Sequence, residues 1–202
     1  MGEKFVRDIV EKEWAMFEAV NGGSGQKASC QEDPQTFHIM RTSQAEAWTE
    51  ELRESYYQDL LSAEAEGRNL MTEKYARMME STDPLYYETI RDLLPALNTE
   101  MLENVEEIIQ ICLKWKEESS RQYPRLAARG RPIHTQDDSP WATSFETYLR
   151  GELQTFSPRT VRLYLDMVRR MDAAGESLEQ ICLLNTARRY GYRSLEEAER
   201  MN

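Results

Sequence analysis

The chain has 202 residues and a formal net charge of -11 at pH 7, with 40% hydrophobic and 30% charged residues. A chain of this length can form one domain whose core needs no disulfide or metal to hold it together. Because nucleic acids are bound mainly through Lys and Arg, the acidic excess argues against a nucleic-acid partner.

The three cysteines are an odd, sparse set, which favours reduced thiols over a disulfide framework. The opening segment MGEKFVRDIVEKEW is charged from its third residue and lacks the apolar region of a signal peptide. No stretch reaches the apolar length of a membrane span. We therefore expect a soluble, cytoplasmic protein without a membrane partner.

Caps and helical periodicity divide the first half of the chain into helices. Apolar residues at helical spacing predict the first helix, which ends at the Gly-rich stretch NGGSGQ. Asp33 before a proline and Asn69 are start signals, and Gly67 is a stop signal. The predicted helices span residues 3–20, 34–66, 69–79 and 84–95.

The second half follows the same pattern. A long helix begins at Asn98, and residues 123–143 then form the longest predicted loop. Later helices are predicted over 144–150, which Gly151 ends, and over 158–175, 177–191 and the last turns from Ser194. The prediction is one all-α domain over residues 1–202, a bundle of about seven to nine helices with no significant sheet.

The pattern Glu-x-Tyr-x-Arg occurs twice, at residues 73–77 and 146–150. A Glu four residues before an Arg is the favourable orientation for a helical ion pair, so both copies are consistent with ordinary solvated pairs. Alternatively, neighbouring helices cover both polar faces. The two carboxylates and two guanidiniums would then converge on one cavity, with both tyrosines directed to the surrounding core.

Four other polar residues are candidates for the same site. Gln44 falls on the apolar stripe of the predicted helix over 34–66, one turn after Arg41, and a buried amide needs a partner or a ligand. Arg129 and Arg131 flank Gly130 in the predicted loop. They suit the lip of a site for an anion, although a solvated charge cluster is the alternative.

Nucleophile, metal and nucleotide signals are weak. Cys30 precedes a predicted helix start, where a thiol can have a lowered pKa, but an unreactive loop thiol is the alternative. His38 and His134 are the only histidines, and no zinc or di-iron ligand spacing is present. The stretch NGGSGQ lacks the lysine of a phosphate-binding loop. We find no metal or nucleotide cofactor signature, although carboxylates alone can hold magnesium.

Five long segments resemble the bacterial domain-of-unknown-function family 4125: KASCQEDP, IMRTSQAEAW, EGRNLMTEKYARMME, ARGRP and TSFETYLRGEL. The resemblance extends from the first predicted helix to YGYRSLEEAE. It implies no particular activity, but some similar proteins carry an added nucleotidyltransferase-like domain, which we do not expect in this chain. The residues that carry the resemblance are mostly polar or aromatic, which favours a shared polar site over a pure scaffold.

We therefore predict a polar pocket that binds a small anionic metabolite and acts on it, in a reaction left open. The catalytic candidates are Glu73, Glu146 and Cys30. The ligand-binding candidates are Arg41, Gln44, Trp48, Tyr75, Arg77, Arg129, Arg131, Trp141, Tyr148 and Arg150. The alternative is a non-catalytic helical module that docks a protein partner, such as a nucleotidyltransferase-like domain. An exposed apolar patch would favour this alternative.

Overall fold

A computed structural model describes residues 2–20, 33–139 and 141–201. Every extended regular element in these ranges is a helix, and the β-type pairing among them is an isolated bridge between Ser139 and Ala142. The predicted all-α class is therefore confirmed. No helix in the described part of the chain is long and apolar enough to cross a membrane.

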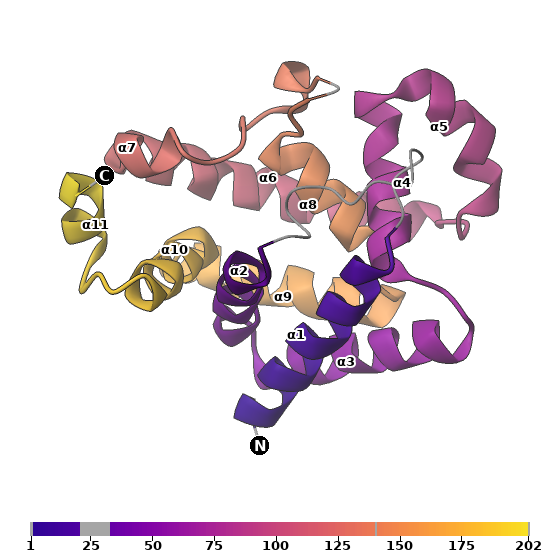
Figure 1. Ribbon diagram of the computed structural model, residues 1–202, viewed down its shortest axis with the longest axis horizontal. Coiled ribbons are helices and arrows are strands. Elements are labelled where there is room, and N and C mark those ends of the chain that lie inside the picture. Colours follow the sequence, from indigo (N-terminus) through magenta and orange to yellow (C-terminus); the bar gives the residue numbers. More distant parts are fainter. Residues whose placement is uncertain (1, 21–32, 140, 202) are drawn as a thin grey trace.

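The described residues contain eleven α-helices and two short 3-10 helices, joined by turns and loops (Figure 1). The α-helices are α1 (Gly2–Glu18), α2 (Pro34–Ala47), α3 (Glu50–Ala65), α4 (Leu70–Thr82), α5 (Pro84–Ile90), α6 (Thr99–Gln122), α7 (Pro124–Ala127), α8 (Phe145–Leu153), α9 (Pro158–Ala174), α10 (Leu178–Arg189) and α11 (Leu195–Met201). The 3-10 helices are η2 (Arg91–Leu93) and η3 (Thr135–Asp137).

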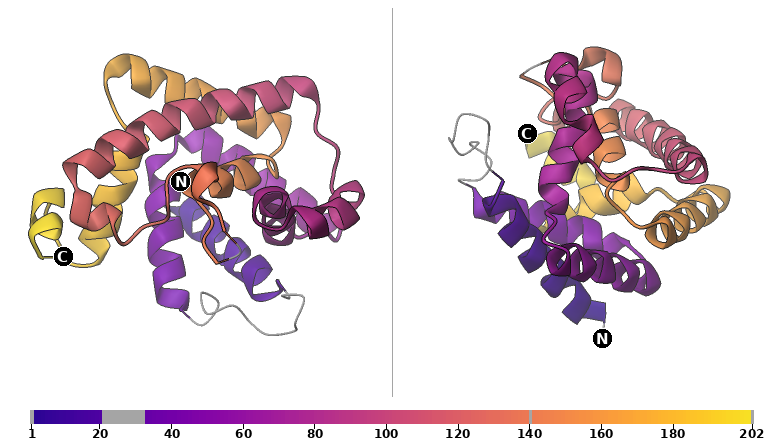
Figure 2. Two further views of the ribbon diagram at one scale, coloured as in Figure 1. Left: turned by 90° about the horizontal axis from the view of Figure 1, so that it is seen from above. Right: turned by 90° about the vertical axis from the view of Figure 1, so that its right-hand side faces the viewer.

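The helices pack in pairs around one main core. The long α6 lies along α9, α4 packs on α8, and α2 packs on α10, while α1 contacts both α2 and α3 (Figure 2). Leu52, Ile109 and Val168, from α3, α6 and α9, are fully buried at the centre of this core. A smaller apolar cluster joins α10 and α11 to the start of α7. Packing of apolar helix faces thus stabilises the whole described chain.

Most predicted helix starts are confirmed by cap hydrogen bonds. In each case a side-chain oxygen accepts a hydrogen bond from a backbone N–H in the first turn, which would otherwise have no partner. The confirmed caps are Asp33, Asn69, Asp83, Asn98, Ser144, Ser157 and Ser177. Gly175 ends α9 at φ 71°, a left-handed conformation that suits glycine.

The predicted helix over 34–66 is two helices, which is one reason that the described residues hold more helices than predicted. Trp48 has an extended backbone, and Thr49 caps α3 by accepting a hydrogen bond from the N–H of Leu52. The Arg53 guanidinium donates to the carbonyls of Ala45 and Trp48, at 3.2 and 2.7 Å, and so satisfies the end of α2. The break lets α2 pack on α10 while α3 packs on α9.

The predicted loop over 123–143 is more ordered than expected, and α7 within it is the second additional helix. The segment before α8 is held to that helix by two backbone bonds, from Phe145 N–H to Pro132 O at 2.7 Å and from Glu146 N–H to Ile133 O at 3.0 Å. Proline and glycine interrupt the sequence pattern in this segment, so its regular structure could not be predicted locally. It depends on contacts with α8.

Gly151 was predicted to end a helix but lies inside α8. A Cβ atom at this position would lie 2.9 Å from Met78 Cγ and 3.0 Å from the carbonyl oxygen of Lys74, both in α4. The glycine is therefore a packing residue that lets α8 approach the backbone of α4.

Replacing Gly151 by Ala should destabilise the protein by about 1–3 kcal/mol, because the added methyl group overpacks the contact between α4 and α8. Gly to Ala inside a helix otherwise stabilises by about 0.5–1 kcal/mol, so the sign of the change identifies the close contact. Urea unfolding of both proteins measures it. An unchanged or increased stability would contradict the close packing of these helices.

Candidate functional site

A cavity of ≈ 770 Å³ lies among α2, α4, α6, α8, α10 and the loop after α7. Its volume is within the range of small-molecule binding sites. Aromatic side chains form much of its wall: Phe17, Phe37, Tyr75, Trp115, Phe145, Tyr148 and Tyr164. Of the predicted ligand-binding residues, six line this cavity: Arg41, Gln44, Tyr75, Arg129, Arg131 and Tyr148.

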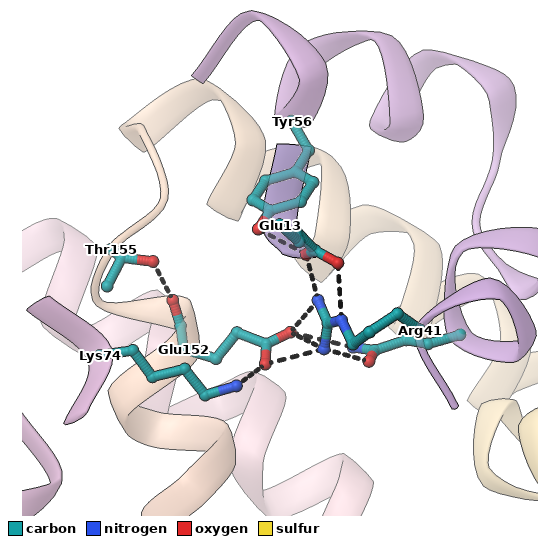
Figure 3. A network of polar contacts seen from close by, with 7 residues as sticks. Glu13, Arg41, Tyr56, Lys74, Glu152 and Thr155 are labelled. Carbon is teal, nitrogen blue, oxygen red and sulfur yellow. Dashed lines mark hydrogen bonds and ion pairs between the residues drawn. The ribbon is translucent and has the colours of Figure 1, made fainter. Parts of the chain in front are cut away.

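A buried network of charged side chains (Figure 3) includes Arg41 and Glu152 of the cavity wall. Arg41 in α2 donates to Glu13 in α1 through Nε at 2.8 Å and Nη2 at 2.5 Å. Its Nη1 and Nη2 donate to Glu152 in α8 at 3.1 and 3.2 Å, and Nη1 also donates to the Gln44 amide oxygen at 2.7 Å. All five N–H groups of the guanidinium are therefore engaged inside the protein.

Lys74 and Tyr56 complete the network from α4 and α3. Lys74 forms an ion pair with Glu152, and the Tyr56 hydroxyl donates to Glu13 at 2.8 Å. Two buried carboxylates are thus balanced by two buried cations. Burial by itself raises the pKa of Glu152, but the charges of Arg41 and Lys74 outweigh it and hold that pKa at about 2.

The network changes the role predicted for Arg41. Holding an anionic ligand would require guanidinium donors, and all of them already bind Glu13, Glu152 and Gln44. Gln44, predicted to need a partner, also donates to Glu152 at 3.1 Å. Both residues line the cavity, but their polar groups bind other residues of the wall. Breaking these bonds to bind a ligand would be unfavourable, because a buried polar group without a partner is costly.

The charged residues of the first motif bind neighbouring loops. Glu73 accepts two hydrogen bonds of 2.8 Å from Arg68 at the turn between α3 and α4. Arg77 is buried and donates to the carbonyl oxygen of Pro95, ahead of α6, at 2.7 Å. Tyr75, between them, lines the cavity. The charged residues of the motif therefore attach two loops to α4: the turn that precedes it and the loop that precedes α6.

The second motif is built in the same way. Glu146 accepts from the backbone N–H of Thr135 at 2.9 Å and pairs with Arg150 at 2.9 Å. Arg150 also pairs with Glu106 in α6 at 2.7 Å. Tyr148 lines the cavity. The ionic side chains thus attach the loop before α8 to that helix and connect α8 with α6.

The two motifs form neither of the arrangements that we considered. Their helices pack together, but none of the four charged side chains is among the described residues that line the cavity. The predicted convergence of Glu73, Arg77, Glu146 and Arg150 on one cavity is therefore wrong. Simple surface pairs are also wrong for the first motif, because both its charges are buried. Both tyrosines line the cavity, which agrees with their place among the ligand-binding candidates but not with the expected orientation toward the core.

Two tryptophans were also predicted to wall the site, and the structure places both elsewhere. Trp48 is buried in the core against the rings of Tyr56, Phe156 and Tyr164. Trp141 is 95% exposed in the loop before α8. The predicted nucleophile Cys30 lies outside the described residues.

The two cysteines that the structure describes, Cys112 and Cys182, both line the cavity. Burial raises the pKa of both thiols, to about 12 for Cys182. They are therefore protonated at neutral pH and weakly nucleophilic.

Arg131 lies at the edge of the cavity above Tyr148. Its guanidinium carbon is 4.5 Å from the centroid of the Tyr148 ring, and Nη1 donates to the carbonyl oxygen of Thr143 at 3.2 Å. Lys74 Nζ is 3.4 Å from the same centroid. Cations are attracted to the electron-rich face of an aromatic ring, so Tyr148 helps to position Arg131.

Apart from Arg41, the charged residues of the network were not predicted, although the pattern that marks Gln44, a polar residue on an apolar helix face, also marks them. Glu13 shares the apolar stripe of α1 with Ile9 and Phe17, Lys74 follows the buried residues at the start of α4, and Glu152 precedes the buried Leu153. A charge on an apolar helix face must be paired on burial. The pairing between distant helices, however, requires the tertiary structure.

Asp138 fastens the arginine-bearing loop to α4 and α8. It accepts hydrogen bonds from the hydroxyl groups of Ser81 and Thr147, both at 2.5 Å, and from the N–H of Ser144 at 2.6 Å. Asp138→Ala should therefore destabilise the protein by about 1.5–3 kcal/mol in chemical unfolding. Because the loop that carries Arg129 would then be less firmly held, trypsin should also cleave faster after Arg129.

The neighbouring Asp137 provides the matched control, because it is exposed. Asp137→Ala should change the stability by less than about 0.5 kcal/mol and leave the cleavage rate unchanged. Equal effects of the two substitutions would contradict the anchoring role of Asp138.

A family model described as protein of unknown function (DUF4125) matches residues 3–200 of the chain. No curated protein and no solved structure matches it. Within the described residues, no group of three or more His, Cys, Asp or Glu side chains is arranged to hold a metal ion.

Proposed function

The chain belongs to the DUF4125 family, and for this member we propose that the cavity binds a small anionic molecule through Arg129 and Arg131. The observation that carries the proposal is the difference among the four cations of the cavity wall. Arg41 and Lys116 are neutralised, the latter by Glu179 at 2.7 Å. Within the described part of the chain, neither loop arginine has a carboxylate partner. Their charge is available to a ligand.

The carboxylates that line the cavity are poorly suited to acid-base catalysis, which favours a binding function. Glu152 is held ionised by two cations, and Glu179 is paired with Lys116. Asp33 caps α2 by accepting a hydrogen bond from the N–H of Thr36. A general base needs a free carboxylate with a pKa near the working pH, which the pKa of Glu152 does not meet.

A thermal-shift screen of carboxylate and phosphate metabolites tests the proposal. At a concentration one hundred times its Kd, a ligand stabilises the native state by about 2.7 kcal/mol. We expect anionic compounds to raise the Tm of the natural protein, and the double substitution Arg129→Gln with Arg131→Gln to abolish that rise. Arg125→Gln, four residues before Arg129 and outside the cavity wall, is the control. Shifts that persist in the double variant would contradict the proposal.

A second candidate function, docking of a protein partner, is supported by exposed apolar residues of α5 and η2. Leu85 and Leu93 are 86% and 82% exposed, and Tyr86 between them is half exposed. These two elements contact each other, and exposed apolar side chains on adjoining elements are typical of interaction sites. Mixing the chain with the nucleotidyltransferase-like domain of a similar protein tests this candidate. Co-elution that Leu85→Ser with Leu93→Ser abolishes would support it, and separate elution would contradict it.

A further inference from the structure

We infer that the ligand of this cavity is an amphipathic anion, with an anionic group at the loop arginines and an apolar, ring-containing body inside. The inference rests on the proposed anion site and adds the chemical class of the ligand. It follows from how the polar and apolar groups of the wall are distributed between the inner part and the edge of the cavity.

Apart from the two loop arginines, the basic and amide groups of the cavity wall already have partners. Arg41 uses all five N–H groups within the charge network, and the Gln44 amide bonds both to Arg41 and to Glu152. The Lys116 ammonium and the Glu179 carboxylate bind each other. A charged ligand group inside the cavity would have to break these bonds or lose its own hydration, and either change is unfavourable.

The remaining inner wall is apolar or aromatic. Tyr75 and Tyr148 come from the paired helices α4 and α8, and the half-buried Leu183 comes from α10. Phe17 and Phe37, which also line the cavity, stack with their ring centroids 5.1 Å apart and their planes 11° apart. Such a wall stabilises a ligand by removing apolar surface from water, and flat rings pack well against its aromatic side chains.

The available positive charge lies at the edge. Arg129 and Arg131 are both solvent-exposed and come from one short loop. Exposed ion pairs are weak, so these arginines orient an anion but do not bind it tightly without other contacts. A bare anion would also leave most of the ≈ 770 Å³ unfilled. The cavity therefore fits a molecule whose body supplies the affinity and whose charge sets its direction.

Two fluorescent probes with the same aromatic body separate these contributions. N-phenyl-1-naphthylamine is neutral, and 8-anilinonaphthalene-1-sulfonate carries one added sulfonate. Titrated into the natural protein, each should bind once per chain, and each should displace the other. Arg131→Gln should weaken the sulfonate probe by about fivefold and leave the neutral probe within about twofold.

Substitutions that fill the cavity test where the body lies. Thr186→Phe in α10 and Met40→Trp in α2 enlarge side chains that line the cavity, and both positions are partly exposed, so folding should tolerate them. Each should weaken both probes by about tenfold. Leu85→Ser with Leu93→Ser removes the exposed apolar surface of α5 and η2, and should change neither affinity.

The outcomes distinguish the inference from the function beneath it. If the neutral probe fails to bind, or binds equally well to both filled variants, the apolar body is wrong. A sulfonate probe that still depends on Arg131 would then leave the anion site supported. If both probes bind inside the cavity but the sulfonate gains nothing from Arg129 or Arg131, the anion site fails, and the amphipathic anion fails with it.

Discussion

Replacing Arg41 by Met should destabilise the protein by about 3–5 kcal/mol, the largest loss that we expect from a single substitution. The guanidinium is buried between Glu13 and Glu152, and Lys74 alone cannot neutralise two buried carboxylates on different helices. Methionine fills much of the volume, so the loss reports the uncompensated charge more than a cavity. Urea unfolding followed by circular dichroism measures the change.

The pair of Arg169 with Glu107 provides the control. It has two hydrogen bonds of 2.6 Å, but both side chains are largely exposed. Arg169→Met should cost less than about 1 kcal/mol. If both substitutions cost the same, the buried network does not hold α1, α2 and α8 together in the way described.

Acid should remove a large part of the stability through Glu152. Its pKa in the folded protein is about 2, below the ordinary value of 4.5. A lowered folded-state pKa favours folding above pH 4.5, and this contribution is lost as the pH falls from about 4.5 to about 2. For a fully buried group, the difference corresponds to about 3 kcal/mol.

The free energy of unfolding, measured by urea titration between pH 6 and about pH 2.5, tests this expectation. Glu152→Gln should lower the stability at pH 6 and flatten the fall below about pH 4.5. Glu107→Gln, at an exposed carboxylate, should keep most of the slope. If Glu152→Gln keeps the full dependence of the unfolding free energy on pH, the acid sensitivity comes from other carboxylates.

Helix starts were predictable because they depend on local chemistry. Asn98 and Ser157 cap their helices with a side chain three residues from the N–H that they bind, so a short window of sequence holds the signal. The break after Trp48 carried a similar signal, since Thr49 precedes two acidic residues. It was missed because the apolar stripe continues across it. The role of Gly151 depends on Met78, far away in sequence, and no local pattern reveals it.

The site was only partly predictable for the same reason. Gln44, Arg131 and both motif tyrosines do line one cavity, and each stands out in the sequence as a polar or aromatic side chain at an unusual position. Which charges remain available depends on partners from other helices. Arg41 is neutralised by a carboxylate 111 positions later in the sequence, and spacing within one helix cannot show this. The repeated motif therefore identified two helices of the cavity wall, α4 and α8, but its charged side chains do not line the cavity.

A crystal structure of the protein with 6-bromo-2-naphthoate tests most directly whether the cavity binds an amphipathic anion. The anomalous signal of bromine locates the aromatic body. We predict a bromine peak inside the cavity, near Tyr75 and Tyr148, and the carboxylate within hydrogen-bond distance of Arg129 or Arg131. A carboxylate directed to Arg41, or bromine bound only on the exposed leucines of α5 and η2, would contradict the account.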